Sequence, residues 1–213
     1  MKIIGLTDIH GRTGYPETLV KQMRSADVIA IAGDITNFGG YSEAGAIIET
    51  IASTNGRIIA VHGNCDKRGV VEFLSARQIN IHALSRIVDD VQFLGLGGSN
   101  KTPFHTPHEY DDEETKEILE AFPQSPRTRF HMLISHAPPF KSKLDRMFLG
   151  LHVGSKPVRE YIEAFQPDIV LCGHIHEARG IDHIGKTLII NPGPFPKHYV
   201  VIDIDKEIAF TLY

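Results

Sequence analysis

Seven side chains that can bind metal ions follow five apolar runs of the sequence, each close to the point where its run ends. They are Asp8, His10, Asp34, Asn64, His136, His174 and His176. Carboxylate, amide and imidazole donors in this mixture favour borderline or hard divalent cations. Because a closed zinc site uses only four ligands, seven donors suit two metal ions that share one carboxylate.

The spacing of these residues supports a common site. Asp8 and His10 are two positions apart, as are His174 and His176. In an extended backbone, side chains two positions apart point the same way, so we expect each pair to face one site. A glycine, which permits sharp turns and close backbone approach, precedes three of the candidates; these are Gly33, Gly63 and Gly173.

The first half of the chain alternates strand-like and helix-like segments. Strands are predicted at 2–8, 27–34 and 57–64, and helices at 15–24, 41–53 and 69–76. This βαβαβ order predicts a parallel sheet. The carboxyl ends of parallel strands share one edge, where ligands bind in α/β proteins. The candidate ligands are therefore expected to meet at that edge.

The second half is more antiparallel. It predicts a hairpin at 87–98 that turns at Asp89 and Asp90, a loop at 100–110 and a helix at 111–121. A strand at 130–135, a helix from Ser155 to before Pro167 and a strand at 168–176 follow, with tail strands near 178–184, 186–191, 198–204 and 207–213. We expect one α/β domain over residues 1–213, with two sheets packed face to face and helices outside.

Composition narrows the functional class. The net charge of −4 gives no overall basic field, so extended nucleic acid is not an expected partner. Two cysteines, Cys65 and Cys172, form no disulfide framework and suit a reducing compartment. The N-terminus lacks the features of a signal peptide and no apolar run is long enough to span a bilayer. A cytoplasmic protein with no membrane partner is expected.

Five short motifs resemble those of one known family. In chain order they are "DIH" (8–10), "GD" (33–34), "GNCD" (63–66), "SHAPP" (135–139) and "GHIH" (173–176). Together they are similar to the motifs of the calcineurin-like metallophosphoesterases. The stretch from Gly154 to Gly180, followed by "NPG" at 191–193, further resembles the Icc-related group of bacterial and archaeal phosphoesterases.

The resemblance implies a fold and a ligand set. The fold would be a four-layer α-β-β-α sandwich of two mixed sheets flanked by helices. Asp8, His10 and His176 would bind one ion, Asn64, His136 and His174 would bind the other, and Asp34 would bridge them. Manganese is the expected ion, with Fe, Zn, Ni and Mg as alternatives.

The resemblance also implies a reaction. A metal-bridging hydroxide would attack the phosphorus of a phosphate ester, with phosphodiesters favoured and small molecules or nucleotides as substrates. Asp34, Asn64 and His136 would be catalytic through the metal ions. Two alternatives stay open: a binding scaffold that keeps the fold without the chemistry, and a nuclease for short nucleic acid. A homo-oligomer is compatible with an exposed edge strand at 207–213.

One position departs from the family pattern. Many members have His after the Asn of the third motif, where it protonates the leaving group, but this chain has Cys65. A thiol is a weak donor with an ordinary pKa near 8.5. Cys65 is interpreted first as a small packed side chain, with a metal-facing or proton-donating role and a covalent nucleophile as alternatives. His152, just before a predicted helix start, is the candidate for a substrate-contacting or acid residue.

Overall fold

Two mixed β-sheets form the centre of the structure, a computed structural model that describes residues 1–123, 128–148 and 150–213. The strands of the first sheet lie in the order β13-β12-β1-β2-β3. Their bounds are β1 Lys2–Leu6, β2 Val28–Ala32, β3 Ile58–Val61, β12 Val200–Ile204 and β13 Ile208–Leu212. The first three strands are parallel, while β12 runs antiparallel to β1 and to β13.

The second sheet has the order β10-β11-β9-β8-β5-β4. Its strands are β4 Ser85–Val88, β5 Val91–Leu96, β8 Phe130–Ser135, β9 Ile169–Leu171, β10 Gly180–Ile184 and β11 Thr187–Asn191. The four central strands, β11, β9, β8 and β5, are parallel, and the edge strands pair antiparallel. A separate pair of short parallel strands contains β6 Ser99–Asn100 and β7 Glu109–Tyr110.

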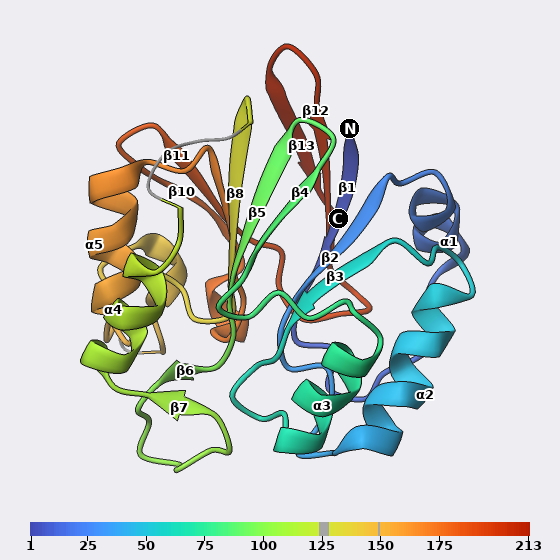
Figure 1. Cartoon of the computed structure of the whole chain (residues 1–213), viewed down its shortest axis with the longest axis horizontal. Helices are drawn as coiled ribbons and strands as arrows, with labels where there is room; N and C mark the ends of the chain where they lie inside the picture. The colour runs from blue at the N-terminus through green and yellow to red at the C-terminus, as the bar shows by residue number, and fades with distance from the viewer. Residues whose placement is uncertain (124–127, 149) are drawn as a thin grey trace.

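Helices cover the outer face of each sheet. One side of Figure 1 has α1 Glu17–Arg24, α2 Tyr41–Ala52 and α3 Arg68–Ala76, and the other has α4 Asp112–Glu120 and α5 Lys156–Phe165. Two single-turn 3₁₀ helices, η1 Lys143–Asp145 and η2 His176–Ala178, lie in the loops. The layers are therefore helix, sheet, sheet and helix, as the family resemblance implied.

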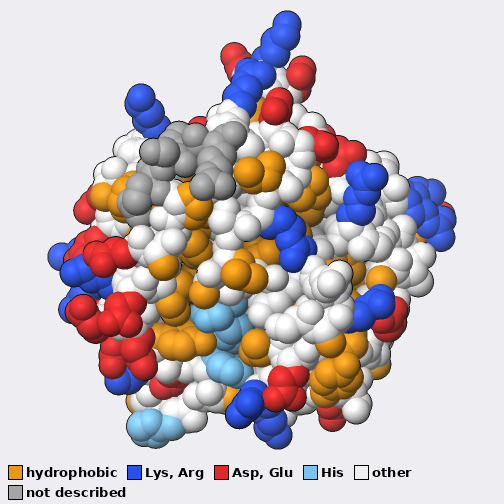
Figure 2. Space-filling model, in the orientation of Figure 1, with side chains coloured by type: hydrophobic (Ala, Val, Ile, Leu, Met, Phe, Trp, Pro, Cys, Tyr) orange, Lys and Arg blue, Asp and Glu red, His pale blue; other side chains and the backbone are white. Residues whose placement is uncertain are grey.

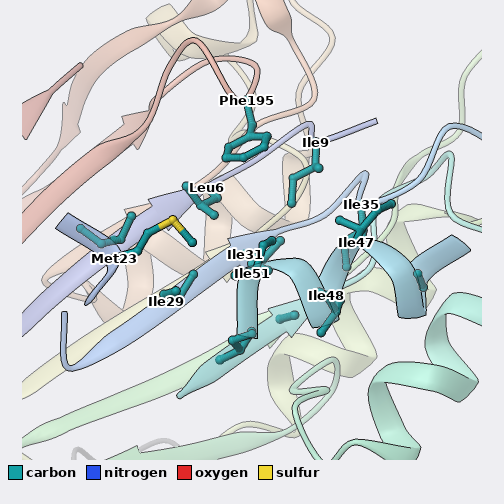
Figure 3. Close-up of a cluster of buried hydrophobic side chains, with 14 of the residues drawn as sticks. Leu6, Ile9, Met23, Ile29, Ile31, Ile35, Ile47, Ile48, Ile51 and Phe195 are labelled. Carbon is teal, nitrogen blue, oxygen red and sulfur yellow. The ribbon is translucent and has the colours of Figure 1, made fainter. Parts of the chain in front are cut away.

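Three buried apolar clusters hold these layers together. In β1, Ile3 faces the second sheet, whereas Ile4 and Leu6 face the helices. Figure 3 shows the helix-side cluster, in which Ile31 of β2 lies beside Ile51 of α2. A third cluster joins α4 and α5 to the second sheet. Because the central strands are buried on both faces, they appear in the sequence as continuous apolar runs.

The predicted helix starts are confirmed at two caps. The Asp111 carboxylate accepts a hydrogen bond from the amide of Glu114, whose own carboxylate accepts one from the amide of Asp111. The Ser155 hydroxyl accepts from the amide of Val158 at the start of α5, which ends before Pro167. Side-chain acceptors of this kind satisfy amides that have no partner in the first helical turn.

Two strand predictions need correction. The hairpin that turns at Asp89 and Asp90 is confirmed, but the predicted loop at 100–110 begins and ends in β6 and β7. The strand predicted at 168–176 ends at Leu171, because the chain bends at Gly173 towards the loop after β1. Within the described ranges, no helix is long and apolar enough to cross a bilayer.

The packing between the sheets can be tested at Phe93. Its ring is fully buried in the cluster between the two sheets. Replacement of Phe93 by Ala leaves a cavity and should lower the free energy of unfolding by about 3–5 kcal/mol. Urea denaturation measures this loss. Ile87→Ala, on the exposed neighbouring strand, should change stability by less than about 0.5 kcal/mol. If Phe93→Ala lowered the free energy of unfolding as little as Ile87→Ala, tight packing between the two sheets would be contradicted.

Candidate metal centre

The predicted site residues lie in the loops that follow five parallel strands. Asp8 follows β1 and Asp34 follows β2. Two backbone hydrogen bonds join their loops: Asp8 N donates to Gly33 O at 3.1 Å, and His10 N donates to Asp34 O at 2.8 Å. The loops of the second sheet are joined in the same way, since Gly173 N donates to His136 O at 3.0 Å. The edge predicted from the sequence is therefore where the loops meet.

The backbone at this edge differs from the expectation of extended pairs. Asp8, His10, Asp34 and His174 have φ values of 52°, 46°, 48° and 67°. A left-handed conformation is uncommon for residues other than glycine and concentrates at functional sites. The alternation rule of strands was therefore the wrong reason for grouping these pairs. Sharp turns, rather than extended strands, bring the side chains together.

One group contains Asp8, His10 and His176, whose ligand atoms lie within 4.8 Å of one another. His176 Nε2 is 3.4 Å from Asp8 Oδ1 and 3.3 Å from His10 Nε2. The buried Asp8 carboxylate is oriented by two donors, the Thr7 hydroxyl at 2.9 Å and the amide of His174 at 3.2 Å. Its position is therefore fixed by the protein.

The second group forms around His136. Its Nε2 lies 2.9 Å from Asn64 Oδ1, and its Nδ1 lies 2.8 Å from the carbonyl oxygen of Ala32. Because that carbonyl can only accept, Nδ1 carries a proton, and Nε2 is the ring nitrogen that faces the site. The ring of His174 lies beside that of His136, with centroids 5.1 Å apart.

Asp34 lies between the two groups. Its Oδ2 is 3.5 Å from His10 Nε2, and its Oδ1 is 3.5 Å from His136 Nε2. The amide of Cys65 donates to Oδ1 at 2.9 Å and fixes the carboxylate. A buried carboxylate with one oxygen towards each group is suited to a bridging position.

These donors fit divalent cations. Two ligand atoms about 2.1 Å from one ion are separated by about 3.0–3.4 Å at octahedral or tetrahedral angles. The separations of 2.9–3.5 Å around His136, Asp34 and His10 agree with this range. A Cβ at Gly63 would overlap Asp34 Oδ1, and one at Gly33 would lie 2.5 Å from His136 Nδ1. Glycine is therefore required for this convergence.

The Cys65 thiol lies among the candidate ligands instead of packing only against apolar side chains. Its thiol forms a third group with His10 and Asp34, with ligand atoms within 4.8 Å, and the residue is partly exposed. Burial raises the pKa of the Cys65 thiol, and the charge of Asp34 raises it further. The protein groups alone therefore keep the thiol protonated. The position next to Asn64 in the sequence was the only signal of this placement.

Asp66 links the loops that carry Asp34 and Asn64. Its buried carboxylate accepts hydrogen bonds from the amides of Gly63, Ile35 and Thr36, at 2.8, 3.1 and 2.7 Å, and from the Thr36 hydroxyl at 2.8 Å. Burial and the neighbouring Asp34 charge raise the pKa of Asp66 to about 6. Asp66 thus holds the turn.

Protonation at the centre depends mainly on burial and on the charges of the candidate ligands. Burial opposes ionisation of Asp8, but the hydrogen bond from His176 and the charge of His136 lower its pKa overall. The same hydrogen bond raises the pKa of His176. Burial lowers the pKa of His10, and lowers that of His174 to about 4. Neutral imidazoles beside ionised carboxylates are the form that metal ions bind.

His152 is not brought into either group. Its Nδ1 contacts Oδ1 of the buried Asp145 at 2.6 Å. Asp145 also accepts from the amides of Lys141 and Gly154, which fixes the carboxylate. His152 lines an open pocket of about 720 Å³ together with Asn100, Lys101, Tyr110 and Lys156. None of the seven candidate ligands lines that pocket. A substrate-contacting or acid role of His152 therefore stays a prediction.

A second histidine cluster lies behind the Asn64 turn. The ring of the buried His62 contacts those of His82 and His108, with centroids 4.6 and 4.5 Å apart. His62 Nε2 and His82 Nε2 face the Tyr110 hydroxyl at 3.2 and 3.5 Å. Figure 2 shows histidine side chains gathered in the middle of one face.

Comparison with known proteins gives a family-model match and a similar full-length sequence. A family model described as calcineurin-like phosphoesterase matches residues 1–178. The chain is similar to MJ1162 of Methanocaldococcus jannaschii, an uncharacterized protein, with 41% identity over 215 residues that cover 98% of this chain and 94% of the relative.

Solved structures share the fold. TT1561 of Thermus thermophilus has a TM-score of 0.74 and 18% identity, covering 99% of this chain and 97% of that one. A putative 5′-nucleotidase from Staphylococcus aureus has a TM-score of 0.62 and 15% identity, and the match covers 100% of this chain but 52% of that one. At these identities the structures show the shared fold alone.

The His82 environment predicts a pH dependence of stability. Burial, with a smaller effect of His108, lowers the pKa of His82 to about 4. The unfolded residue titrates near 6.5, so its contribution is fully present above that pH and is lost as the pH falls towards 4. The loss should approach about 1.4 kcal/mol for each pH unit. Denaturation at several pH values should show a shallower slope for His82→Gln than for wild type or for the exposed His183→Gln. Equal slopes would contradict this account.

Proposed function

We propose, from the premise that this chain belongs to the calcineurin-like phosphoesterase family, that it hydrolyses phosphate esters with two bound divalent cations. The observation that carries the proposal is the convergence of Asp8, His10 and His176 on one side of Asp34 with Asn64 and His136 on the other. We further propose that residues 1–213 act as one domain, and that both free cysteines suit a cytoplasmic location.

The chain would hold the ions in two places. Asp8, His10 and His176 would bind one, and Asn64, His136 and His174 the other, with Asp34 shared. Such ions supply positive charge to phosphate oxygens and lower the pKa of a water molecule, and manganese is the ion we favour. The protein's part is orientation: Ala32 fixes the His136 ring, Thr7 fixes Asp8, and the Cys65 amide fixes Asp34.

Protonation of the leaving group distinguishes this chain from many relatives. Cys65 occupies the position of their imidazole, and its raised pKa makes the thiol a poor acid. Poor leaving groups should therefore react slowly, and activated phosphodiesters should be the most readily hydrolysed substrates. His152 stays a candidate acid, because Asp145 orients its Nδ1 and leaves Nε2 for another partner.

Two alternatives are less consistent with the structure. A scaffold without chemistry would have no need for four candidate ligands in the left-handed conformation. A nuclease for short nucleic acid gains no support from a basic track, because Lys and Arg are interspersed with Asp and Glu on the face in Figure 2. Small phosphate esters or nucleotides are therefore the substrates we propose.

The shared carboxylate gives the first test. With Mn²⁺, the purified protein should hydrolyse bis(p-nitrophenyl) phosphate, and Asp34→Ala should lower kcat/KM at least about 100-fold by removing a ligand common to both ions. Metal content should be measured in the same samples. His105→Ala changes an exposed histidine outside the candidate centre and is the control. Undiminished turnover in Asp34→Ala would contradict the bridging role.

The Cys65 position gives the second test. Cys65→His should raise turnover of alkyl phosphodiesters about tenfold or more, while aryl diesters with good leaving groups change little. The ratio of the two rates isolates leaving-group protonation from metal binding. Cys65→Ser should keep the metal content of the wild type. Loss of an ion in Cys65→Ser would show instead that the thiol is a ligand.

A further inference from the structure

The most exposed large apolar side chains belong to two loops. Phe148, Phe104 and Leu151 are 85%, 77% and 63% exposed, more than any other large hydrophobic side chain described. Met147, at 40%, lies next to Phe148. We call these four residues the apolar rim. Burial of two such rings against a partner would be favourable, because their apolar surface would leave water.

Both loops border the candidate metal centre, at different groups of ligands. The amide of Phe148 donates to Glu177 Oε1 at 3.3 Å, beside His176. In the other loop, the Thr106 hydroxyl accepts from Asn64 Nδ2 at 3.1 Å, two residues after Phe104. The loop between β6 and β7 projects at the lower edge of Figure 1. The apolar rim therefore flanks the centre instead of lying elsewhere on the molecule.

Hydrogen bonds hold both loops in these conformations. Met147 N donates to Leu151 O, and Gly150 N donates to Met147 O, both at 2.9 Å, in the loop that carries Phe148. In the Phe104 loop, Glu109 Oε1 accepts from the hydroxyls of Thr102 and Thr106 and from the amide of Thr106, at 2.6–2.8 Å. Both rings therefore belong to loops with internal hydrogen bonds among their described residues.

Basic side chains accompany the rim. Lys141, Lys143 and Arg146 are all exposed and lie within seven residues of Phe148. Lys143 is paired with Asp182 at 3.6 Å. Among the described residues, Lys141 and Arg146 have no carboxylate partner. Two cations without a carboxylate partner, on the loop that carries the exposed Phe148 ring, match an anionic interface with an apolar interior.

We propose that the apolar rim docks the protein on anionic lipid bilayers, with Phe104 and Phe148 inserted and Lys141 and Arg146 at the headgroups. A bilayer fits better than a protein partner, because the rim side chains stand on separate loops and none of them lines the pocket of about 720 Å³. A fluid interface can accept separate protrusions, whereas a protein anchor needs one pocket. The sequence-based expectation of no membrane partner concerned spanning segments and is revised here.

Docking would also influence which substrates reach the centre, an inference that rests on the proposed phosphoesterase function. The rim flanks the candidate metal centre, so a docked molecule would have this centre near the headgroup region. Phosphate esters at a lipid surface would then be the substrate class that reaches the centre most readily.

Vesicle sedimentation tests the docking itself, in EDTA and without substrate, so that hydrolysis plays no part. The wild-type chain should sediment with phosphatidylcholine vesicles that contain phosphatidylserine, and much less with phosphatidylcholine alone. Phe148→Ser and Phe104→Ser should each weaken partitioning about tenfold. Arg146→Glu should weaken it about fivefold or more, through lost attraction to anionic lipid.

Matched controls separate docking from a general loss of apolar surface. Ile87→Ser and Leu84→Ser remove side chains that are 47% and 53% exposed, in β4 and just before it. They should bind vesicles like the wild type. The rim variants should also retain wild-type turnover of soluble bis(p-nitrophenyl) phosphate, so a failure to dock is distinguishable from a failure of the proposed chemistry.

Three results would overturn docking. The first is wild-type protein that stays in the supernatant with both vesicle types. The second is equal weakening by Phe148→Ser and Ile87→Ser. The third is light scattering that shows a dimer lost in Phe148→Ser, without vesicle binding, which would assign the rim to a second copy of the chain.

Discussion

Buried oxygen and nitrogen lone pairs face one another where the two sheets meet, and the remaining features of the site follow from this arrangement. Asn64 Oδ1 lies 2.9 Å from His136 Nε2. The two oxygens of Asp34 face different imidazoles, Oδ2 facing His10 and Oδ1 facing His136, each at 3.5 Å. No Lys or Arg is among the candidate ligands. Burial of such groups without positive charge is costly, which makes bound cations the natural compensation.

The fold supports this arrangement at some conformational cost. Parallel strands of both sheets end at one edge, and sharp turns with positive φ bring Asp8, Asp34 and His174 inward. Asp66 uses four hydrogen bonds to keep the Asp34 and Asn64 loops together. The apolar clusters on both sides of each sheet make the strand ends rigid enough to hold these turns. Stability away from the centre thus offsets strain within it.

The sequence was informative where local patterns determine structure. Continuous apolar runs located β1, β2, β3 and β8, and residue types predicted the helix starts near Asp111 and Ser155. The grouping of the seven candidates followed from their positions after strands. Their backbone conformation did not, because the alternation rule assumes an extended chain and the loops are bent by contacts between sheets.

Other features depend on distant contacts and could not be predicted from one sequence. His152 follows a pattern typical of a helix start, but its partner Asp145 and its separate pocket arise from the packing of the loop before α5. Likewise, Phe104 and Phe148 look like any core phenylalanine in the sequence, and only the fold shows that their rings face water. The same holds for the Cys65 thiol, which lies beside His10 through contacts across three loops.

A crystal grown with Mn²⁺, with anomalous scattering measured at the manganese edge, tests the central claim most directly. The account predicts two anomalous peaks per chain, about 3.5–4 Å apart. One should lie beside Asp8, His10 and His176, the other beside Asn64, His136 and His174, with Asp34 between them. A single peak, or peaks away from these residues, would contradict a two-ion centre built on Asp34.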